Sequence, residues 1–404
     1  MNKARDSKPH IGIFGRRNNG KSSFINALTG QDTAIVSAIP GTTTDPVKKS
    51  IEIDGVGPVV MIDTAGNDDS GELGLKRIGK TLEALKIIDL AILVMAHNEF
   101  DEPEKALIHN FRENNLPFFI LYNKADEEAI SPELERVIRE RYQAPLVTFS
   151  SLHPRNLNEV AKIIRETMPE TIFHKQTLLG DLIRKDDVVL LITPIDIEAP
   201  EGRMILPQVQ VIRDVLDHDG IAVLCKESEV EAFVRTMNPK PVLAITDSQA
   251  FARANAAIPP EIPLTSFSIV LAHQKGDFEN YLKGTSHISR LRDGDRVLIL
   301  ESCTHHLTCD DIGRVKIPRW LTNFTGKKLE FEVIAGLGTI PSPITDFSLV
   351  IQCGGCMITH RQIINRLKPA IDAGIPVTNY GFAIAYMHGI YDRAIQPFRK
   401  EEKG

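Results

Sequence analysis

This 404-residue chain has no long apolar run, and it has few cysteine and tryptophan residues, five and one respectively. No apolar stretch approaches the ~18 residues of a membrane-spanning helix, so we expect no membrane segment. The segment Met1–Lys8 is polar and charged, which predicts a cytoplasmic protein without a signal peptide. Five cysteines without a leader argue against a disulfide scaffold and favour metal or redox chemistry.

The chain also has no excess of basic residues. The formal net charge is −6, and Arg16–Arg17 and Lys327–Lys328 are too short to form a basic patch. We find no stretch in which aromatic and basic residues alternate, as they do on many nucleic-acid-binding surfaces. We therefore expect no nucleic-acid partner. The length of the chain predicts two or three domains.

A phosphate-binding loop lies near the start of the chain. The segment from Gly15 to Ser22 has the pattern GxxxxGKS, and it lies between an expected strand, His10–Phe14, and an expected helix, Ser23–Leu28. In such a loop, backbone N–H groups and the helix N-terminus face the phosphates. Lys21 would neutralise the β- and γ-phosphates, and Ser22 would bind Mg²⁺. The expected nucleotide-binding residues of this loop are Gly15, Asn18, Asn19, Gly20, Lys21, Ser22 and Ser23.

Three further polar segments follow expected strands. Asp63–Gly66 follows an apolar run and would hold the Mg²⁺ shell. Asn123–Asp126 follows Pro117–Tyr122, and a carboxylate there would accept hydrogen bonds from guanine N1–H and the exocyclic amine, which adenine does not offer. Ser150–Ser151 follows Leu146–Phe149, where a short loop would back the base. The predicted GTP site therefore adds Asp63, Gly66, Asn123, Lys124, Asp126, Ser150 and Ser151.

This part of the chain, about residues 8–170, resembles the G domain of translation-factor-like GTPases. Asn18 and the run Pro40–Asp45 are similar to the potassium-activated GTPases typified by the tRNA-modification enzyme TrmE. That resemblance implies that Asn18 helps to bind K⁺ beside the phosphates and that Thr43 reaches Mg²⁺. Lys21 and Thr43 are then the expected catalytic residues.

Two positions depart from these families. Thr44 stands where an arginine is usual, and Asn67 stands where Ras-like proteins place a glutamine that positions water. The sequence therefore names no residue that orients the attacking water. We predict slow GTP hydrolysis, stimulated by potassium.

Apolar segments alternate with amphipathic ones in the middle of the chain. They are rich in Val, Ile and Leu, as in parallel strands that are covered on both faces. Cys225 stands at a strand end with no other Cys or His nearby, and we interpret it as a core residue. The expected strands are Val188–Thr193, Gly220–Leu224 and Val242–Thr246, with helices over 204–216 and 227–237.

Cysteine and histidine gather at two places in the last third. Cys303 and His305 follow the expected strand Arg296–Leu300, and Cys353-Gly-Gly-Cys356 follows the expected strand Phe347–Ile351. The carboxyl ends of parallel strands are where such sheets bind ligands, so we expect both segments at one site. Three thiolates and an imidazole fit either a structural zinc or three irons of a 4Fe–4S cluster.

The three regions together resemble the HydF family, the maturation factors of FeFe-hydrogenases, over essentially the whole chain. The resemblance implies a scaffold with a 4Fe–4S cluster on Cys303, Cys353 and Cys356, and it leaves the role of His305 open. It also implies a di-iron precursor, built with the radical-SAM maturases HydE and HydG and delivered to apo FeFe-hydrogenase, HydA. Gln352 departs from the family, many members of which carry His there, and an amide is a poor iron ligand.

We therefore expect an α/β protein in which a P-loop G domain precedes two smaller parallel α/β domains. The expected boundaries are 1–172 for the GTP-binding domain, 180–266 for a dimerisation domain and 267–404 for the cluster-binding domain. The resemblance implies a homodimer that forms through the middle domain. The alternative is a tRNA- or ribosome-associated GTPase with a structural zinc site, and the acidic charge of the chain argues against it.

Overall fold

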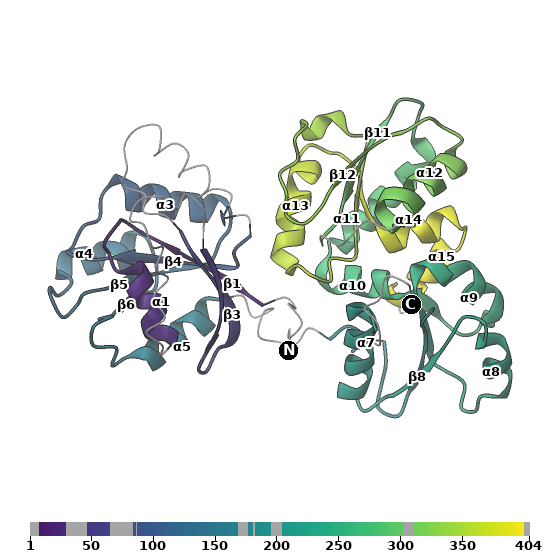
Figure 1. Ribbon diagram of the computed structural model, residues 1–404, viewed down its shortest axis with the longest axis horizontal. Coiled ribbons are helices and arrows are strands. Elements are labelled where there is room, and N and C mark those ends of the chain that lie inside the picture. The colour runs from purple at the N-terminus through teal and green to yellow at the C-terminus, as the bar shows by residue number, and fades with distance from the viewer. Residues whose placement is uncertain are drawn as a thin grey trace. The chain divides into compact units, whose positions relative to one another are not determined.

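The computed structural model describes residues 8–29, 47–64, 84–85, 87–168, 177–180, 182–194, 204–302 and 311–399 (Figure 1). The chain divides into two compact units, Lys8–Lys175 and Gln176–Gly404. The prediction of a P-loop domain followed by further parallel α/β structure is confirmed.

The described strands of the first unit form one sheet in the order β2-β3-β1-β4-β5-β6, in which β2 is antiparallel to β3 and the other pairs are parallel. The strands are β1 His10–Phe14, β2 Val47–Ile53, β3 Gly57–Asp63, β4 Leu90–Met95, β5 Phe118–Tyr122 and β6 Leu146–Thr148. The helices are α1 Lys21–Thr29, α3 Glu102–Glu113, α4 Pro132–Arg136 and α5 Leu157–Thr167.

Helices cover both faces of this sheet. Phe24 of α1 and Ile164 of α5 belong to the apolar cluster on one face, and Phe111 of α3 belongs to the cluster on the other. Because β4 is covered on both faces, all of its residues are buried and apolar. The polar segments that follow β1, β5 and β6, and Asp63 at the end of β3, consequently lie at one edge of the sheet, the carboxyl edge of its parallel strands.

The described strands of the second unit form two parallel sheets, in the orders β10-β9-β7-β8 and β12-β11-β13-β14. The strands are β7 Val188–Ile192, β8 Ile221–Cys225, β9 Leu243–Thr246, β10 Leu264–Ser266, β11 Arg296–Leu300, β12 Glu330–Ile334, β13 Leu349–Gln352 and β14 Val377–Asn379. The helices are α7 Leu206–Asp217, α8 Val230–Thr236, α9 Phe251–Ala257, α10 Phe267–Lys275, α11 Phe278–Thr285, α12 Ile317–Thr325, α13 His360–Asp372, α14 Tyr380–Met387 and α15 Tyr391–Ile395.

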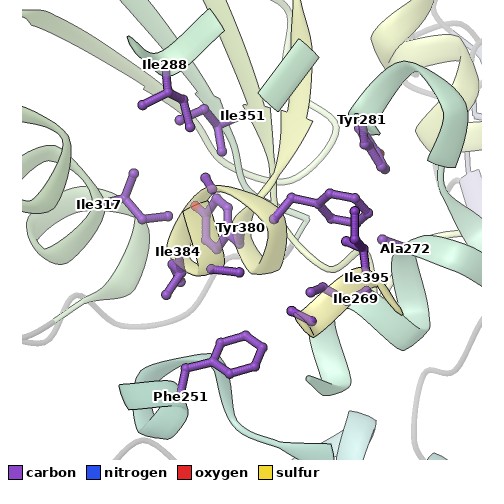
Figure 2. Close-up of a cluster of buried hydrophobic side chains, with 14 of the residues drawn as sticks. Phe251, Ile269, Ala272, Tyr281, Ile288, Ile317, Ile351, Tyr380, Ile384 and Ile395 are labelled. Atoms are coloured by element: carbon purple, nitrogen blue, oxygen red, sulfur yellow. The ribbon is translucent and has the colours of Figure 1, made fainter. Parts of the chain in front are cut away.

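The two sheets of this unit share one apolar core. Figure 2 shows Phe251 of α9 and Ile269 of α10 in the same cluster as Ile351 of β13, Ile384 of α14 and Ile395 of α15. The α14 helix is apolar on nearly all sides because it is buried in this core. The shared packing places β11 and β13 in one core with α10 and α14, and the carboxyl end of β13 carries the CxxC segment.

Candidate functional site

The predicted phosphate loop lies between the end of β1 at Phe14 and the start of α1 at Lys21. Two positions of the loop require glycine, because neighbouring atoms lie too close to leave room for a Cβ. A Cβ on Gly15 would lie 2.1 Å from the Val94 carbonyl oxygen, and one on Gly20 would lie 2.3 Å from Asn123 Nδ2. Both glycines also have positive φ, 137° and 84°. The loop therefore packs directly on β4 and on the segment that follows β5.

The Lys21 side chain is buried against its own loop. Its Nζ donates hydrogen bonds to the carbonyl oxygens of Gly15, at 2.9 Å, and Arg16, at 2.7 Å. An ammonium group at the N-terminus of a helix, together with the loop N–H groups, forms an anion site. Phosphate oxygens, which carry full charge, would bind this ammonium more strongly than the carbonyls do.

Ser22 and Asp63 form the expected metal-binding pair. The Ser22 hydroxyl donates to Asp63 Oδ2 at 2.9 Å, and Asp63 Oδ1 is buried without a hydrogen-bond partner among the described residues. Burial raises the pKa of the Asp63 carboxyl, while the Ser22 hydrogen bond and the Lys21 charge oppose that rise. A buried carboxylate oxygen that lacks a donor is suited to a Mg²⁺ ion or its bound water.

The segment after β5 joins the loop to the expected base site. Asn123 Nδ2 donates to the Asn19 carbonyl oxygen at 2.9 Å, and Asn123 Oδ1 accepts from Ser151 N at 3.1 Å and Ser151 Oγ at 3.0 Å. The Asp126 carboxylate is exposed, and a hydrogen bond with Ser150 lowers the pKa of its carboxyl group. Asp126 is therefore ionised and accessible, as a carboxylate that accepts N–H groups of guanine must be.

The two asparagines of the loop have different surroundings. Asn18 is exposed and has φ 64°, which places its amide at the surface of the loop. Asn19 is buried, and its Nδ2 donates to the Val94 carbonyl oxygen at 3.3 Å. Any contact between Asn19 and a phosphate therefore comes through its backbone N–H. Two predicted site residues, Thr43 and Gly66, lie outside the described residues.

The CxxC segment begins directly after β13. The Cys353 backbone N donates to the Leu300 carbonyl oxygen at 2.9 Å, which continues the pairing of β13 with β11. Gly355 has φ 68°, so the turn between the cysteines requires a conformation that glycine adopts at little cost. Both Cys353 and Cys356 are partly buried. As predicted, the cysteines follow a parallel strand at its carboxyl end.

Two N–H donors and one hydroxyl surround the Cys353 sulfur, and the Cys353 thiol itself donates to that hydroxyl, Ser302 Oγ. Sγ lies 3.1 Å from Ser302 N, 2.9 Å from Ser302 Oγ and 3.4 Å from Gln352 Nε2. The Cys353 carbonyl oxygen accepts from Asn379 Nδ2 at 3.1 Å, and Asn379 Oδ1 accepts from Ser268 Oγ at 3.2 Å. Sequence reasoning did not assign Ser302, Asn379 or Ser268 to the site, because their contacts to the CxxC segment come from strand pairing between distant parts of the chain.

A positive charge lies in the same region. Arg366 of α13 donates to the carbonyl oxygens of Glu301, at 2.6 Å, and Ile334, at 2.8 Å, which follow or end β11 and β12. Burial lowers the pKa of Arg366, and the nearby Cys353, Tyr380 and Glu301 groups oppose that change. An arginine remains charged in proteins. The guanidinium therefore adds positive potential where anionic thiolates are expected.

The described residues include only part of the expected metal-binding set. Cys303 and His305 lie outside them. Within the ranges that the structure describes, no three His, Cys, Asp or Glu side chains converge as a metal-binding group. None of the helices in those ranges is long and apolar enough to cross a membrane.

Sequence models of known families match all three regions of the chain. Residues 178–276 match the hydrogen maturase F dimerization domain, and residues 279–397 match the hydrogen maturase F tetramerization domain. The chain belongs to the HydF family. Residues 10–124 match a model described as 50S ribosome-binding GTPase, so a GTPase domain that binds GTP with Mg²⁺ precedes the two HydF domains.

Several curated GTPases are similar to part of the chain. GTPase Der of Wolinella succinogenes is 35% identical over 164 residues, which cover 38% of this chain and 34% of that protein. The tRNA modification GTPase MnmE of Nitrosomonas europaea is 32% identical over 171 residues, 42% of this chain and 36% of that protein. GTPase Era of Pseudomonas aeruginosa is 33% identical over 168 residues, 40% of this chain and 55% of that protein. The chain thus spans about a third to a half of the length of these relatives.

Proposed function

We propose that this chain is a GTP-hydrolysing scaffold that binds a 4Fe–4S cluster and carries a di-iron precursor to apo FeFe-hydrogenase, HydA. The observation that carries the proposal is the position of Cys353. Its sulfur lies 3.1 Å from the backbone N of Ser302, and Cys303 is the next residue in the sequence. The CxH and CxxC segments therefore start from neighbouring strand ends, β11 and β13, of one sheet.

The donor chemistry of the described residues fits an iron–sulfur cluster. Cys353 and Cys356 provide soft thiolates, and N–H groups of Ser302 and Gln352 face the Cys353 sulfur. With Cys303, three thiolates would hold three irons. The amide of Gln352 leaves the fourth iron without a fixed ligand at that position, while His305 is the candidate neighbour. When bound, the cluster supplies an iron that binds exchangeable ligands, and the precursor is the cargo.

The nucleotide site supplies the switch in this proposal. Lys21, Ser22 and Asp63 bind the phosphates and Mg²⁺, and Asp126 reads guanine. We propose slow turnover with K⁺ held beside the phosphates by Asn18. The loops around Thr43 and Gly66 would respond to the γ-phosphate and so report the nucleotide state.

Association of two copies fits the edge of the sheet of the dimerization domain. In the order β10-β9-β7-β8, β8 is an edge strand, and Ile221 and Leu224 on it are 51% and 42% exposed. An exposed apolar edge strand favours pairing with another strand. Leu216 of α7 and Phe233 of α8 are also exposed apolar side chains of this domain. We propose a homodimer that pairs along β8, with HydE, HydG and HydA as further partners.

Cysteine variants test the scaffold role. We expect that Cys303→Ser, Cys353→Ser and Cys356→Ser each abolish cluster assembly, measured as iron and sulfide bound after anaerobic reconstitution. Cys225→Ser is the matched control, because Cys225 lies on β8 and should leave iron binding unchanged. His305→Ala should retain a cluster with an altered EPR spectrum.

Lys21→Ala should abolish GTP hydrolysis and keep the iron, and loss of iron in that variant would show that the two sites are not separable.

Transfer of the precursor tests the partner assignment. Loaded protein mixed with apo FeFe-hydrogenase should activate it, whereas Cys353→Ser protein treated in the same way should not. Equal activation by both proteins would contradict delivery from this site.

A further inference from the structure

We propose that Ser302 and Gln352 are positioning residues that donate hydrogen bonds to the Cys353 sulfur and raise the reduction potential of the bound cluster. The inference rests on the proposed 4Fe–4S site, and it assigns a function to two residues that would not bind iron themselves. It also gives Gln352, which departs from the family at this position, a role other than that of a ligand.

The contacts of the sulfur carry this inference. Ser302 N lies 3.1 Å from Cys353 Sγ, Ser302 Oγ lies 2.9 Å from it, and Gln352 Nε2 lies 3.4 Å from it. A thiolate bound to iron accepts hydrogen bonds and has no proton to donate. The Ser302 hydroxyl, which rotates freely, can then turn to donate to the sulfur. Two residues thus present three donors to one sulfur.

The Gln352 amide is held in the donor orientation. Its side chain is fully buried, and the two N–H groups of Nε2 are shared among three acceptors, Ser302 Oγ at 3.0 Å, the Cys353 carbonyl oxygen at 3.2 Å and Cys353 Sγ at 3.4 Å. A carbonyl oxygen only accepts, so a flipped amide would place two oxygens against each other. Oε1 has no hydrogen-bond partner among the described residues, so the printed contacts of this amide are those of Nε2.

Backbone hydrogen bonds after β11 and β13 fix the positions of Ser302 and Cys353 relative to each other. Glu301 N donates to the Ile334 carbonyl oxygen at 2.9 Å, so the chain before Ser302 continues the β11–β12 pairing. Cys353 N donates to the Leu300 carbonyl oxygen at 2.9 Å, which continues the β11–β13 pairing. In this register Glu301 is opposite Cys353, and Ser302, one residue further on, brings its N and Oγ to the Cys353 sulfur.

The physical consequence is a more easily reduced cluster. In the couple considered, the 2+ core takes one electron and becomes the 1+ core, and no proton or ligand is exchanged. Hydrogen bonds to a cluster sulfur stabilise negative charge, so they favour the reduced form, which carries one more negative charge. Removing a donor should therefore move the midpoint potential to a more negative value.

The test is a dithionite titration of anaerobically reconstituted full-length protein, followed by EPR. We expect Ser302→Ala and Gln352→Leu each to lower the equilibrium constant for reduction about tenfold, which is about 59 mV for a one-electron couple. Ser302→Thr keeps the hydroxyl and should retain the parental potential. Ser268→Ala is the matched control, because that hydroxyl donates to Asn379 and not to the sulfur. Unchanged potentials in both Ser302→Ala and Gln352→Leu would overturn the inference.

A second measurement needs only the parent protein. The exchangeable protons of these donors should appear as couplings in the ENDOR spectrum of the reduced cluster and disappear after transfer to D₂O. A reduced cluster without exchangeable proton couplings would overturn the inference even if the variants failed to assemble a cluster. A parent protein that binds no iron would instead overturn the proposed function.

Discussion

The Arg16 guanidinium in the phosphate loop donates through Nε and Nη2 to the two carboxylate oxygens of Glu104 on α3, at 2.9 and 2.8 Å. Glu104 is 1% exposed, and its Oε2 also accepts from the backbone N of Asp101 at 2.9 Å. The same guanidinium donates to Asp101 Oδ2 at 3.0 Å. Because the Arg16 carbonyl also accepts from Lys21 Nζ, the pair joins Lys21 to α3. Bidentate pairing of this kind fixes geometry as well as charge.

Loss of this pair should destabilise the G domain and weaken GTP binding. Arg16→Ala leaves the buried Glu104 charge without its partner, and we expect the free energy of unfolding to fall by about 3 kcal/mol. Far-UV circular dichroism in urea measures it, while fluorescence of Trp320, the one tryptophan of the chain, follows the second unit separately. Arg17→Ala, the exposed neighbour, is the control. Equal effects of the two variants would contradict a specific role for Arg16.

Potassium should accelerate GTP hydrolysis relative to sodium at equal ionic strength. The exposed amide of Asn18, with φ 64°, is the group that we expect beside the cation. Asn18→Ala should remove the difference between the two salts while leaving the rate in sodium close to that of the parent. Phosphate release measured in KCl and NaCl decides the question. If the parent hydrolyses GTP equally fast in both, the potassium site does not exist.

Charged residues on β8 should convert the proposed homodimer into a monomer. Ile221→Lys together with Leu224→Lys places like charges on both copies of an exposed edge strand, which opposes pairing. Leu152→Lys is the control, because Leu152 is also exposed but lies in the G domain. Sedimentation velocity gives the oligomeric state. Dimers of unchanged stability in the double variant would place the interface elsewhere.

Stability of the G domain should decrease as pH falls from 6.5 towards 4. Burial lowers the pKa of His10 to about 4, whereas an unfolded chain binds that proton near 6.5. The unfolded state therefore binds more protons in this window, and the free energy of unfolding falls by about 2–3 kcal/mol on acidification. His10 Nδ1 lies 2.9 Å from the Lys8 carbonyl oxygen, and the amide of His10→Asn can still donate to it. Circular dichroism in urea at several pH values measures the slope.

His10→Asn should remove most of this pH dependence, because the amide does not titrate. The matched control is His109→Asn, which changes an exposed histidine of α3. A slope that His109→Asn reduces as much as His10→Asn would exclude the buried ring as its source.

Short-range sequence patterns predicted the strand ends that carry the site. The loop after β1 and the CxxC segment after β13 are recognisable because their motifs directly follow apolar strands. The strand β12, Glu330–Ile334, is harder to predict, because acidic residues alternate with apolar ones on an edge that is half exposed. The sequence also predicted that Gln352 is a poor iron ligand, but it did not predict the hydrogen bonds of that amide.

Long-range pairs could not be predicted in the same way. Arg16 and Glu104 are 88 residues apart, and Ser302 and Cys353 are 51 residues apart. Nothing in their local sequence specifies the partner, because strand order and register decide which distant residues meet. Cys303 and His305 were predicted from the sequence, and they remain predictions because they lie outside the described residues.

The metal content of anaerobically purified and reconstituted protein tests the central claim most directly. Iron, acid-labile sulfide and zinc are measured on the same sample, with Cys353→Ser protein treated in parallel. The account predicts brown protein with about four irons and an equal amount of sulfide per chain, and almost none in the variant. Colourless protein with one zinc and no sulfide per chain would contradict it.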